Sequence, residues 1–184
     1  MQYRHIPRAI LLMMLALALS LALSGCSAGT ATAAPTIGGG GGGHAGPASL
    51  YPNPALTPGD LFPGVTAKEV CVSGYSSSVR SVSSDEKAAV YQRYGIPNPA
   101  QGAPAGKHEV DHFISLELGG SNALTNLWPE PYVTPDGPNK IGAREKDKVE
   151  NYLHAEVCAG RMPLPQAQDA IRTDWYAVYL RIAK

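Results

Sequence analysis

The stretch that decides the fold runs from His108 to Trp128 and reads HEVDHFISLELGGSNALTNLW. β-branched and aromatic residues precede a polar turn, Gly119-Gly120-Ser121-Asn122, and Asn126 then leads into Leu127-Trp128-Pro129. Apolar runs bounded by glycine, asparagine and serine indicate strands. A helical pattern begins near Gly142. The stretch therefore predicts a strand, a loop, a short return strand and a helix, a ββα unit whose polar residues cluster where its loop faces the helix.

Three short words in this region carry a resemblance to a known family. Asp111-His112 is followed by the word LELGG ending at Gly120, and then by Asn126-Leu127. At this spacing the words resemble the HNH nucleases of the ββα-metal superfamily, over roughly residues 94–160. The region from Val70 onward is also similar to small secreted bacterial HNH-type proteins, through the words DH, LELGG, NLWPEP, KD and VC. The resemblance implies a metal-dependent hydrolase that cuts phosphodiester bonds of DNA or, alternatively, RNA.

The resemblance also implies roles for individual residues. His112 is expected to be the general base, because a histidine titrates near neutral pH, and Asp111 is expected to bind the metal. Asn126 matches the middle motif residue, which braces the loop by hydrogen bonds and so orients His112. Asn122 is a competing candidate for that position, but its place beside Gly-Gly-Ser fits an ordinary turn.

The third motif position departs from the family pattern. HNH proteins carry a histidine or asparagine on the helix as a second metal ligand, and the first helical turns here contain neither. Asp147 and Glu150 lie one helical turn apart and are the expected ligands, with Asn139, just before the helix, as a third option. A site made of carboxylates favours a hard ion, Mg²⁺ or Mn²⁺, over Zn²⁺.

Strand geometry restricts the pair Asp111-His112. Adjacent residues in a regular strand point to opposite faces, so the two share a site only if the strand bulges or twists there. The alternative is an exposed Asp111 beside a half-buried histidine that serves the fold.

The charge of the chain counts against a nucleic-acid substrate. Its formal charge is zero, and removal of an N-terminal segment that contains Arg4 and Arg8 leaves 13 basic against 15 acidic residues. A nucleic-acid-binding domain is usually strongly basic. A local group of cations next to the expected site is either a solvated helix face or a phosphate-binding stripe: Lys140, Arg144, Lys146 and Lys148.

The N-terminus indicates export. Arg4, His5 and Arg8 precede an apolar run over residues 9–23 that is short for a membrane span. The run ends in Leu23-Ser24-Gly25-Cys26, which resembles a bacterial lipobox. Residues 1–26 are therefore expected to be a lipoprotein signal peptide, with cleavage before Cys26, lipidation of its thiol (palmitate among the acyl chains) and anchoring to a bacterial cell membrane. An ordinary secretory signal is the alternative.

The composition divides the remaining chain into a tether and one domain. Residues 27–59 are rich in glycine, alanine, proline, serine and threonine and are expected to form a flexible tether, since they offer little apolar surface to bury. Residues 60–184 are expected to form the HNH-like domain. Cys71 and Cys158 are expected to form a disulfide, because export exposes them to an oxidising compartment. Zinc binding by this pair is not expected, since neither cysteine has a C-x-x-C neighbour.

The flanking segments carry further helix signals. Ser83 and Glu86 form a capping box before a helix that ends at Tyr94, where Gly95 is a natural terminator. Thr66–Cys71 is expected to be a helical turn, residues 72–82 extended, and residues 129–139 a proline-rich loop. A helix from Gly142 to Val157 and a last helix beyond Pro165 follow.

The fold class is thus a small, disulfide-stapled α+β domain with a ββα-metal core. Its expected function is a metal-dependent endonuclease in the cell envelope. A non-catalytic envelope lipoprotein that uses the ββα scaffold to bind a partner is the alternative.

Overall fold

The computed structural model describes residues 48–99, 107–134 and 141–184. It is an α+β fold in which a two-stranded antiparallel hairpin is followed by helices, as the sequence predicted. In chain order the elements are η1 (Ala48–Leu50), α1 (Ala67–Val70), α2 (Tyr75–Val79), α3 (Ser84–Tyr94), β1 (His108–His112), η3 (Leu116–Leu118), β2 (Leu127–Pro131), α4 (Ala143–Cys158) and α5 (Leu164–Ile182). The predicted signal peptide with Cys26, and also Asn139 and Lys140, lie outside the described residues.

The hairpin pairs β1 with β2 so that Glu109 lies opposite Glu130 and Asp111 opposite Trp128. The first strand is shorter than the apolar pattern predicted, because it ends at His112 and the chain then forms the 3-10 turn η3. The second strand extends into the predicted proline-rich loop, as far as Pro131. Prolines are compatible with it because both strands of a two-stranded sheet are edge strands, in which half of the N–H groups have no strand partner.

The helix signals in the sequence are confirmed. At the start of α3 the Ser83 hydroxyl accepts a hydrogen bond from Glu86 N, and the Glu86 carboxylate accepts one from Ser83 N in return. The helix ends at Gly95, whose φ of 64° is the left-handed conformation that favours glycine. Helix α4 covers the predicted range within one residue at each end. Helix α5 begins at Leu164, so Pro165 lies in its first turn and not before it as predicted, and the helix bends at Asp174.

Residues 72–82 differ from the prediction. They were expected to be extended, but Tyr75–Val79 form the short helix α2, preceded by Gly74 with a φ of 81°. Serine favours turns and helix starts over strands, because its hydroxyl hydrogen-bonds to nearby backbone groups. Ser78 does this here, since its hydroxyl donates to Tyr75 O.

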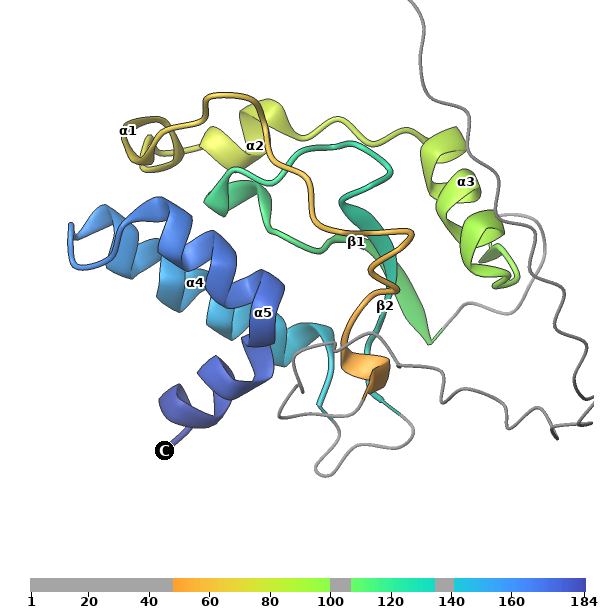
Figure 1. Cartoon of the computed structure of the whole chain (residues 1–184). Helices are drawn as coiled ribbons and strands as arrows, with labels where there is room; N and C mark the ends of the chain where they lie inside the picture. The colour runs from red at the N-terminus through yellow and green to blue at the C-terminus, as the bar shows by residue number, and fades with distance from the viewer. Residues whose placement is uncertain (1–47, 100–106, 135–140) are drawn as a thin grey trace, which may run out of the picture. The chain divides into compact units, whose positions relative to one another are not determined.

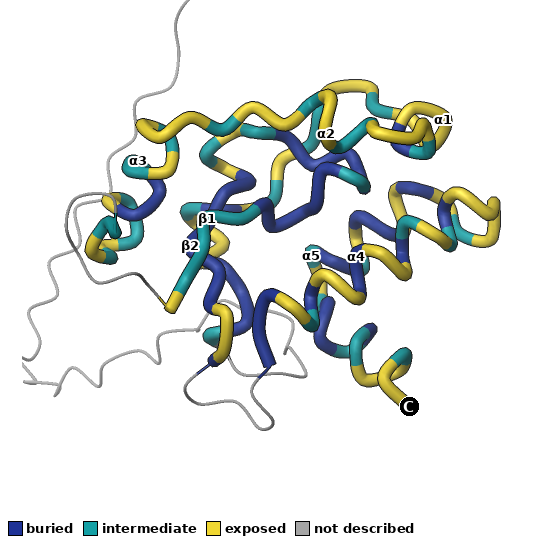
Figure 2. The backbone as a smooth tube through the Cα atoms, turned by 180° about the vertical axis from the view of Figure 1, so that it is seen from behind, coloured by how far each residue is buried: buried dark blue, intermediate teal, exposed yellow. Residues whose placement is uncertain are grey.

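The core lies between the hairpin, its loop and the two long helices (Figure 2). Its largest fully buried side chain is that of Trp175 of α5, whose Nε1 donates a hydrogen bond to Leu50 O. Leu50 and Tyr51 are buried in this core, and Thr57 is also buried, donating to Leu127 O. The tether predicted to reach residue 59 is therefore too long, because these apolar side chains belong to the folded part.

Helices α4 and α5 pack side by side, and the hairpin lies between them and α3 (Figure 1). None of the helices in the described ranges is long and apolar enough to cross a membrane.

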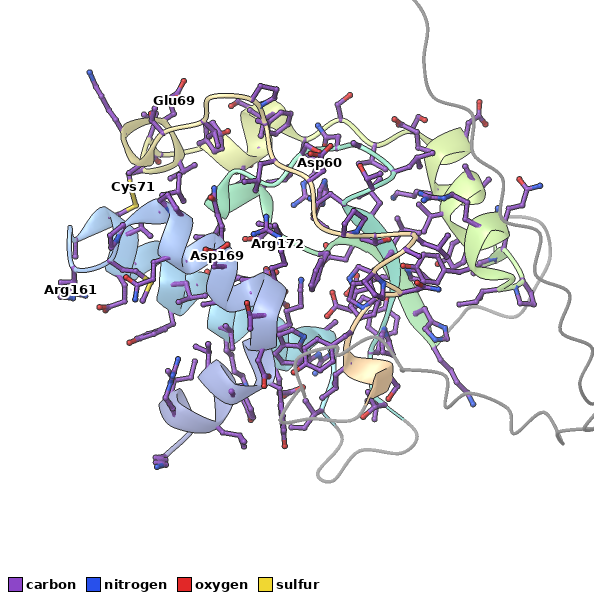
Figure 3. All side chains as sticks on the ribbon, in the orientation of Figure 1. Asp60, Glu69, Cys71, Arg161, Asp169 and Arg172 are labelled. Atoms are coloured by element: carbon purple, nitrogen blue, oxygen red, sulfur yellow. A yellow bond between two sulfur atoms is a disulfide. The ribbon has the colours of Figure 1, made fainter. Side chains whose placement is uncertain are left out.

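The predicted disulfide is confirmed. It joins Cys71, which ends α1, to Cys158, the last residue of α4, with the two Cα atoms 5.5 Å apart (Figure 3). The two cysteines are 87 residues apart in the sequence. Closing a loop of that length stabilises the folded state by about 4–5 kcal/mol on the chain-entropy estimate.

Candidate functional site

The loop between the strands is built around Asn126, which is completely buried. Its side-chain oxygen accepts a hydrogen bond from Ile114 N, and its amide nitrogen donates to Ile114 O and to Ser121 O, each at 2.9 Å. Its own backbone oxygen accepts from Phe113 N at 2.7 Å. Asn126 thus ties both ends of the loop together just after β1, which is the bracing role predicted for it.

Glycine is required at the two final positions of LELGG for two different physical reasons. Gly119 has a φ of 80°, which a residue with a side chain rarely adopts. Gly120 has no such φ, but a Cβ at this position would clash with the Ile114 carbonyl and with the amide of Asn126. The backbone must therefore come close to Asn126 at Gly120, and only glycine allows it.

His112 ends β1 and is almost completely buried, with 3% of its surface exposed. Its Nδ1 lies 4.0 Å from Asp111 Oδ1, so the two neighbouring side chains lie together at the point where the regular strand ends. Its Nε2 lies 3.0 Å from the side-chain oxygen of Asn122. The side chain that contacts the histidine is thus that of Asn122, the competing candidate of the sequence analysis.

The contacts of Asn122 determine which ring nitrogen of His112 carries the hydrogen. The Asn122 amide nitrogen donates to Val79 O at 2.8 Å, and Ser81 N donates to the side-chain oxygen of Asn122 at 3.3 Å. A carbonyl only accepts and a backbone N–H only donates, so the orientation of this amide is fixed. Its oxygen therefore accepts from His112 Nε2–H, which leaves the lone pair of a neutral imidazole on Nδ1, beside Asp111.

The surroundings keep His112 neutral. Burial lowers its pKa below the usual value, and the positive charges of Arg80 and Lys146 act in the same direction. The hydrogen bond to Asn122 and the Asp111 carboxylate oppose this shift without reversing it. At neutral pH the imidazole is therefore an unprotonated base.

Asp111 is held by a buried lysine. Lys146 of α4 is fully buried, and its Nζ donates to Asp111 Oδ2 at 3.2 Å, to Glu150 Oε1 at 2.5 Å and to His112 O at 2.9 Å. Glu130 Oε2 lies 3.3 Å from the same nitrogen. Three carboxyl groups thus surround one ammonium group, at the place where the sequence predicted a divalent cation.

The pKa shifts in this cluster differ in sign. Burial would raise the pKa of Asp111, but the Lys146 ammonium and nearby hydrogen bonds bring it below its usual value. Burial raises the pKa of Glu150 to about 8 and that of Glu130 well above its usual value, in spite of the same ammonium. The side-chain hydrogen bond between Glu130 and Asp111 adds to the raised pKa of Glu130 and to the lowered pKa of Asp111. At neutral pH the charges of Lys146 and Asp111 nearly balance, and Glu150 is mainly protonated.

The predicted metal ligands are only partly brought together. The Glu150 carboxyl group faces Lys146, and its Oε1 already accepts a hydrogen bond from Lys146 Nζ. Asp147 is more exposed, and the charge of Asp111 helps raise the pKa of both Asp147 and Glu109, so the three carboxylates lie in one electrostatic environment. Among the described histidines, cysteines and carboxylates, the group of three with ligand atoms within 4.8 Å of one another is Cys71, His154 and Cys158.

A pocket of about 160 Å³ opens beside the cluster. Its lining includes Glu150, Arg80 and Ser115, and the hydroxyl of Ser115 is buried without a hydrogen-bond partner. Arg80 lies between the two residues that bind Asn122, so the pocket adjoins the contacts that hold His112. This gives the site an opening lined by polar groups.

Two important residues were not identified from the sequence as parts of the site. Lys146 stood within a run of charges on an exposed-looking helix, where its neighbours Arg144 and Lys148 are indeed exposed. The usable signal was the pair Lys146–Glu150 at a spacing of four, directly after the motif region. Glu130 gave no signal, because it lies between two prolines and only the strand register shows that it shares a face with Asp111.

Comparison with known proteins gives no assignment. No protein-family model matches the chain, and neither does any curated protein or solved structure. The function therefore has to be argued from the site.

Proposed function

We propose that this chain is a metal-dependent endonuclease of the HNH type that hydrolyses phosphodiester bonds of DNA or, alternatively, RNA in the bacterial cell envelope. The observation that carries the proposal is His112, a neutral imidazole with Nε2–H bound to Asn122 and Nδ1 directed to the side of Asp111. A histidine whose second nitrogen is held by an acceptor is a typical general base. The ββα arrangement of β1, β2 and α4 and the DH, LELGG and NL words support the same reading.

The chemical step needs little from the chain. His112 Nδ1 accepts a proton from a water molecule while the water oxygen forms a bond to phosphorus. The bond from phosphorus to the leaving oxygen breaks, and that oxygen takes a proton from solvent. The Asn122 oxygen stabilises the imidazolium that results, because its hydrogen bond strengthens as the ring becomes charged.

A divalent cation would stabilise the negative charge of the phosphoryl oxygens and of the leaving oxygen. Lys146 binds Asp111 through Oδ2, and the partly exposed Asp111 lies in the same environment as Asp147. These two carboxylates would hold the ion, and oxygen ligands suit Mg²⁺ or Mn²⁺. Glu150 fits this role less well, because Lys146 uses its carboxyl group.

The test is nicking of supercoiled plasmid with Mg²⁺ or Mn²⁺, and with chelator as the blank. We expect His112→Ala to lose about 10²–10⁴-fold in rate, the usual contribution of a general base. His108→Ala is the matched control, since it removes a histidine from the same strand, four residues away. The proposal fails if the wild type cuts and His112→Ala cuts at the same rate.

Asn122 gives a second test that a merely structural role would not pass. Asn122→Asp keeps an oxygen for Nε2–H and adds a negative charge, which favours the imidazolium. The rise of kcat/KM with pH should therefore move to higher pH. Asn122→Ala should lower kcat roughly 10- to 100-fold, the value of a hydrogen bond to a charged group. An unchanged pH profile in Asn122→Asp would show that Asn122 does not act through His112.

The non-catalytic alternative is favoured by Lys146. The buried ammonium group already neutralises Asp111, so the cluster can serve as a structural element without a metal ion. If the wild type cuts neither DNA nor RNA with Mg²⁺ or with Mn²⁺, partner binding by an envelope lipoprotein becomes the better proposal. In both cases we propose anchoring through Cys26, by the lipobox resemblance.

A further inference from the structure

A second group of ligand-type residues lies at the other end of α4, away from Lys146. Cys71 ends α1, while His154 and Cys158 are one turn apart on α4, and their sulfur and nitrogen atoms all lie within 4.8 Å of one another. The disulfide joins the two cysteines, and His154 Nε2 lies 3.3 Å from Cys158 Sγ. The yellow sulfur atoms at this place are seen in Figure 3 beside the label of Cys71.

We propose that, when the Cys71–Cys158 disulfide is reduced, these three residues hold a zinc ion. A dithiol reductant supplies two electrons and two protons, the S–S bond breaks, and the reductant leaves as its own disulfide. Zn²⁺ then displaces both thiol protons to solvent and binds two thiolates and one imidazole. The site is separate from His112 and does not depend on the proposed nuclease function.

The ligand set favours zinc over the hard ions expected near Asp111. Thiolate and imidazole are its preferred ligands, and three protein ligands leave a fourth position for water. A pocket of about 260 Å³ adjoins the cluster and is lined by Cys71, His154 and residues 72–77. The spacing of four between His154 and Cys158 places both on one face of α4.

His154 has a partner on each side of its ring. Nε2 lies 3.0 Å from Val70 O, which can only accept, so Nε2 carries the hydrogen in the oxidised form. Nδ1 lies 3.9 Å from Glu117 Oε2. Moving the hydrogen to Nδ1 frees the Nε2 lone pair for the metal and directs the Nδ1–H toward a carboxylate. Zinc-bound histidines commonly have such a carboxylate behind them, which fixes the tautomer.

The zinc ion would take over the mechanical role of the disulfide. Both connect the end of α1 to the last turn of α4, so the reduced chain would keep this connection in the presence of zinc. Disulfide and metal exclude each other, because both use the same two sulfur atoms.

The experiment is a cobalt titration of the full chain reduced with a phosphine, followed by zinc competition. We expect thiolate-to-cobalt charge-transfer absorption and the visible bands of a tetrahedral site, both lost on adding zinc. The oxidised chain and the Cys71→Ser/Cys158→Ser variant should show neither. Because this variant keeps Cys26, it is also the control for cobalt binding by that cysteine. Should reduction lower the helical signal, zinc should restore it. Absence of the thiolate–cobalt absorption in the reduced wild type overturns the proposal.

Two variants test the individual contacts. His154→Ala should bind cobalt far more weakly than the wild type, and equal affinity would overturn the proposed ligand set. Glu117→Gln should lose about 10- to 100-fold in affinity, as is usual when the partner of a metal-bound histidine is removed. Asp169→Asn on α5 is the matched control, because it removes an exposed carboxylate that pairs with Arg172 and should leave the affinity unchanged.

Discussion

Replacing Glu150 by glutamine should remove a pH dependence of stability that the wild type carries. Glutamine has nearly the same shape, and its carbonyl oxygen can still accept the hydrogen bond from Lys146 Nζ. Burial raises the pKa of Glu150 from 4.5 to about 8. Between these two values the folded chain binds a proton that the unfolded chain has released, so this group makes the folded state less stable as the pH rises.

The magnitude follows from this shift. One proton taken up by the folded state alone changes the free energy of unfolding by about 1.4 kcal/mol per pH unit. From pH 5 to pH 8 the wild type should therefore lose on the order of 3–4 kcal/mol through Glu150, while Glu150→Gln loses none of it. The stability of the variant relative to wild type should improve by that amount over this range.

Urea unfolding at several pH values measures the effect, with chelator present so that bound metal does not contribute. The fluorescence of the buried Trp128 and Trp175 reports unfolding. Asp169→Asn, on the exposed face of α5, should give a curve parallel to the wild type. If the difference between Glu150→Gln and wild type stays constant within about 0.5 kcal/mol from pH 5 to 8, the carboxyl group is not protonated in the folded state and our account of the cluster is wrong.

Three further outcomes are expected. Asn126→Ala leaves buried groups of Ile114 and Ser121 without partners, so it should cost about 1–3 kcal/mol for each of them in urea unfolding, and a total loss below 1 kcal/mol would contradict the bracing role. Cys71→Ser/Cys158→Ser should lower the free energy of unfolding by about 4–5 kcal/mol under non-reducing conditions; an unchanged Tm would show that the loop closure contributes little. Cys26→Ala should shift the chain from the membrane to the soluble fraction of expressing cells, and identical partitioning would exclude the lipid anchor.

Much of the fold could be predicted because its signals are local. The Ser83–Glu86 capping box and Gly95 determined the ends of α3, and both rest on contacts within a few residues. The disulfide followed from chemistry alone, since two cysteines remained once Cys26 was assigned to lipid. Residues 72–82 and the second strand were harder to predict, because serine-rich and proline-rich segments show no hydrophobic periodicity.

The site was less accessible to sequence reasoning because its key contacts are long-range. Asn122 contacts His112 only because the loop folds back after Gly119 and Gly120, and its amide is oriented by Val79 and Ser81 from another segment. Lys146 is buried because its ammonium group pairs with the Asp111 carboxylate and also contacts the carboxyl groups of Glu130 and Glu150, two of these three residues coming from the hairpin. No pattern in the helix alone distinguishes it from the solvated lysines around it.

Helix α4 carries Lys146, Glu150, His154 and Cys158, each one turn beyond the last. The four side chains form a single row, so the disulfide at one end fixes the rotation of the helix about its axis, and with it the direction of the ammonium group about 18 Å away. Inserting one residue between Glu150 and His154 would turn the two halves of the row apart by about 100°, so either the sulfur or the ammonium would lose its partner. An insertion of four residues would nearly restore the rotation but add about 6 Å of length. The disulfide at Cys158 therefore helps to fix the direction from which the Lys146 ammonium group meets Asp111, although the disulfide contacts neither residue.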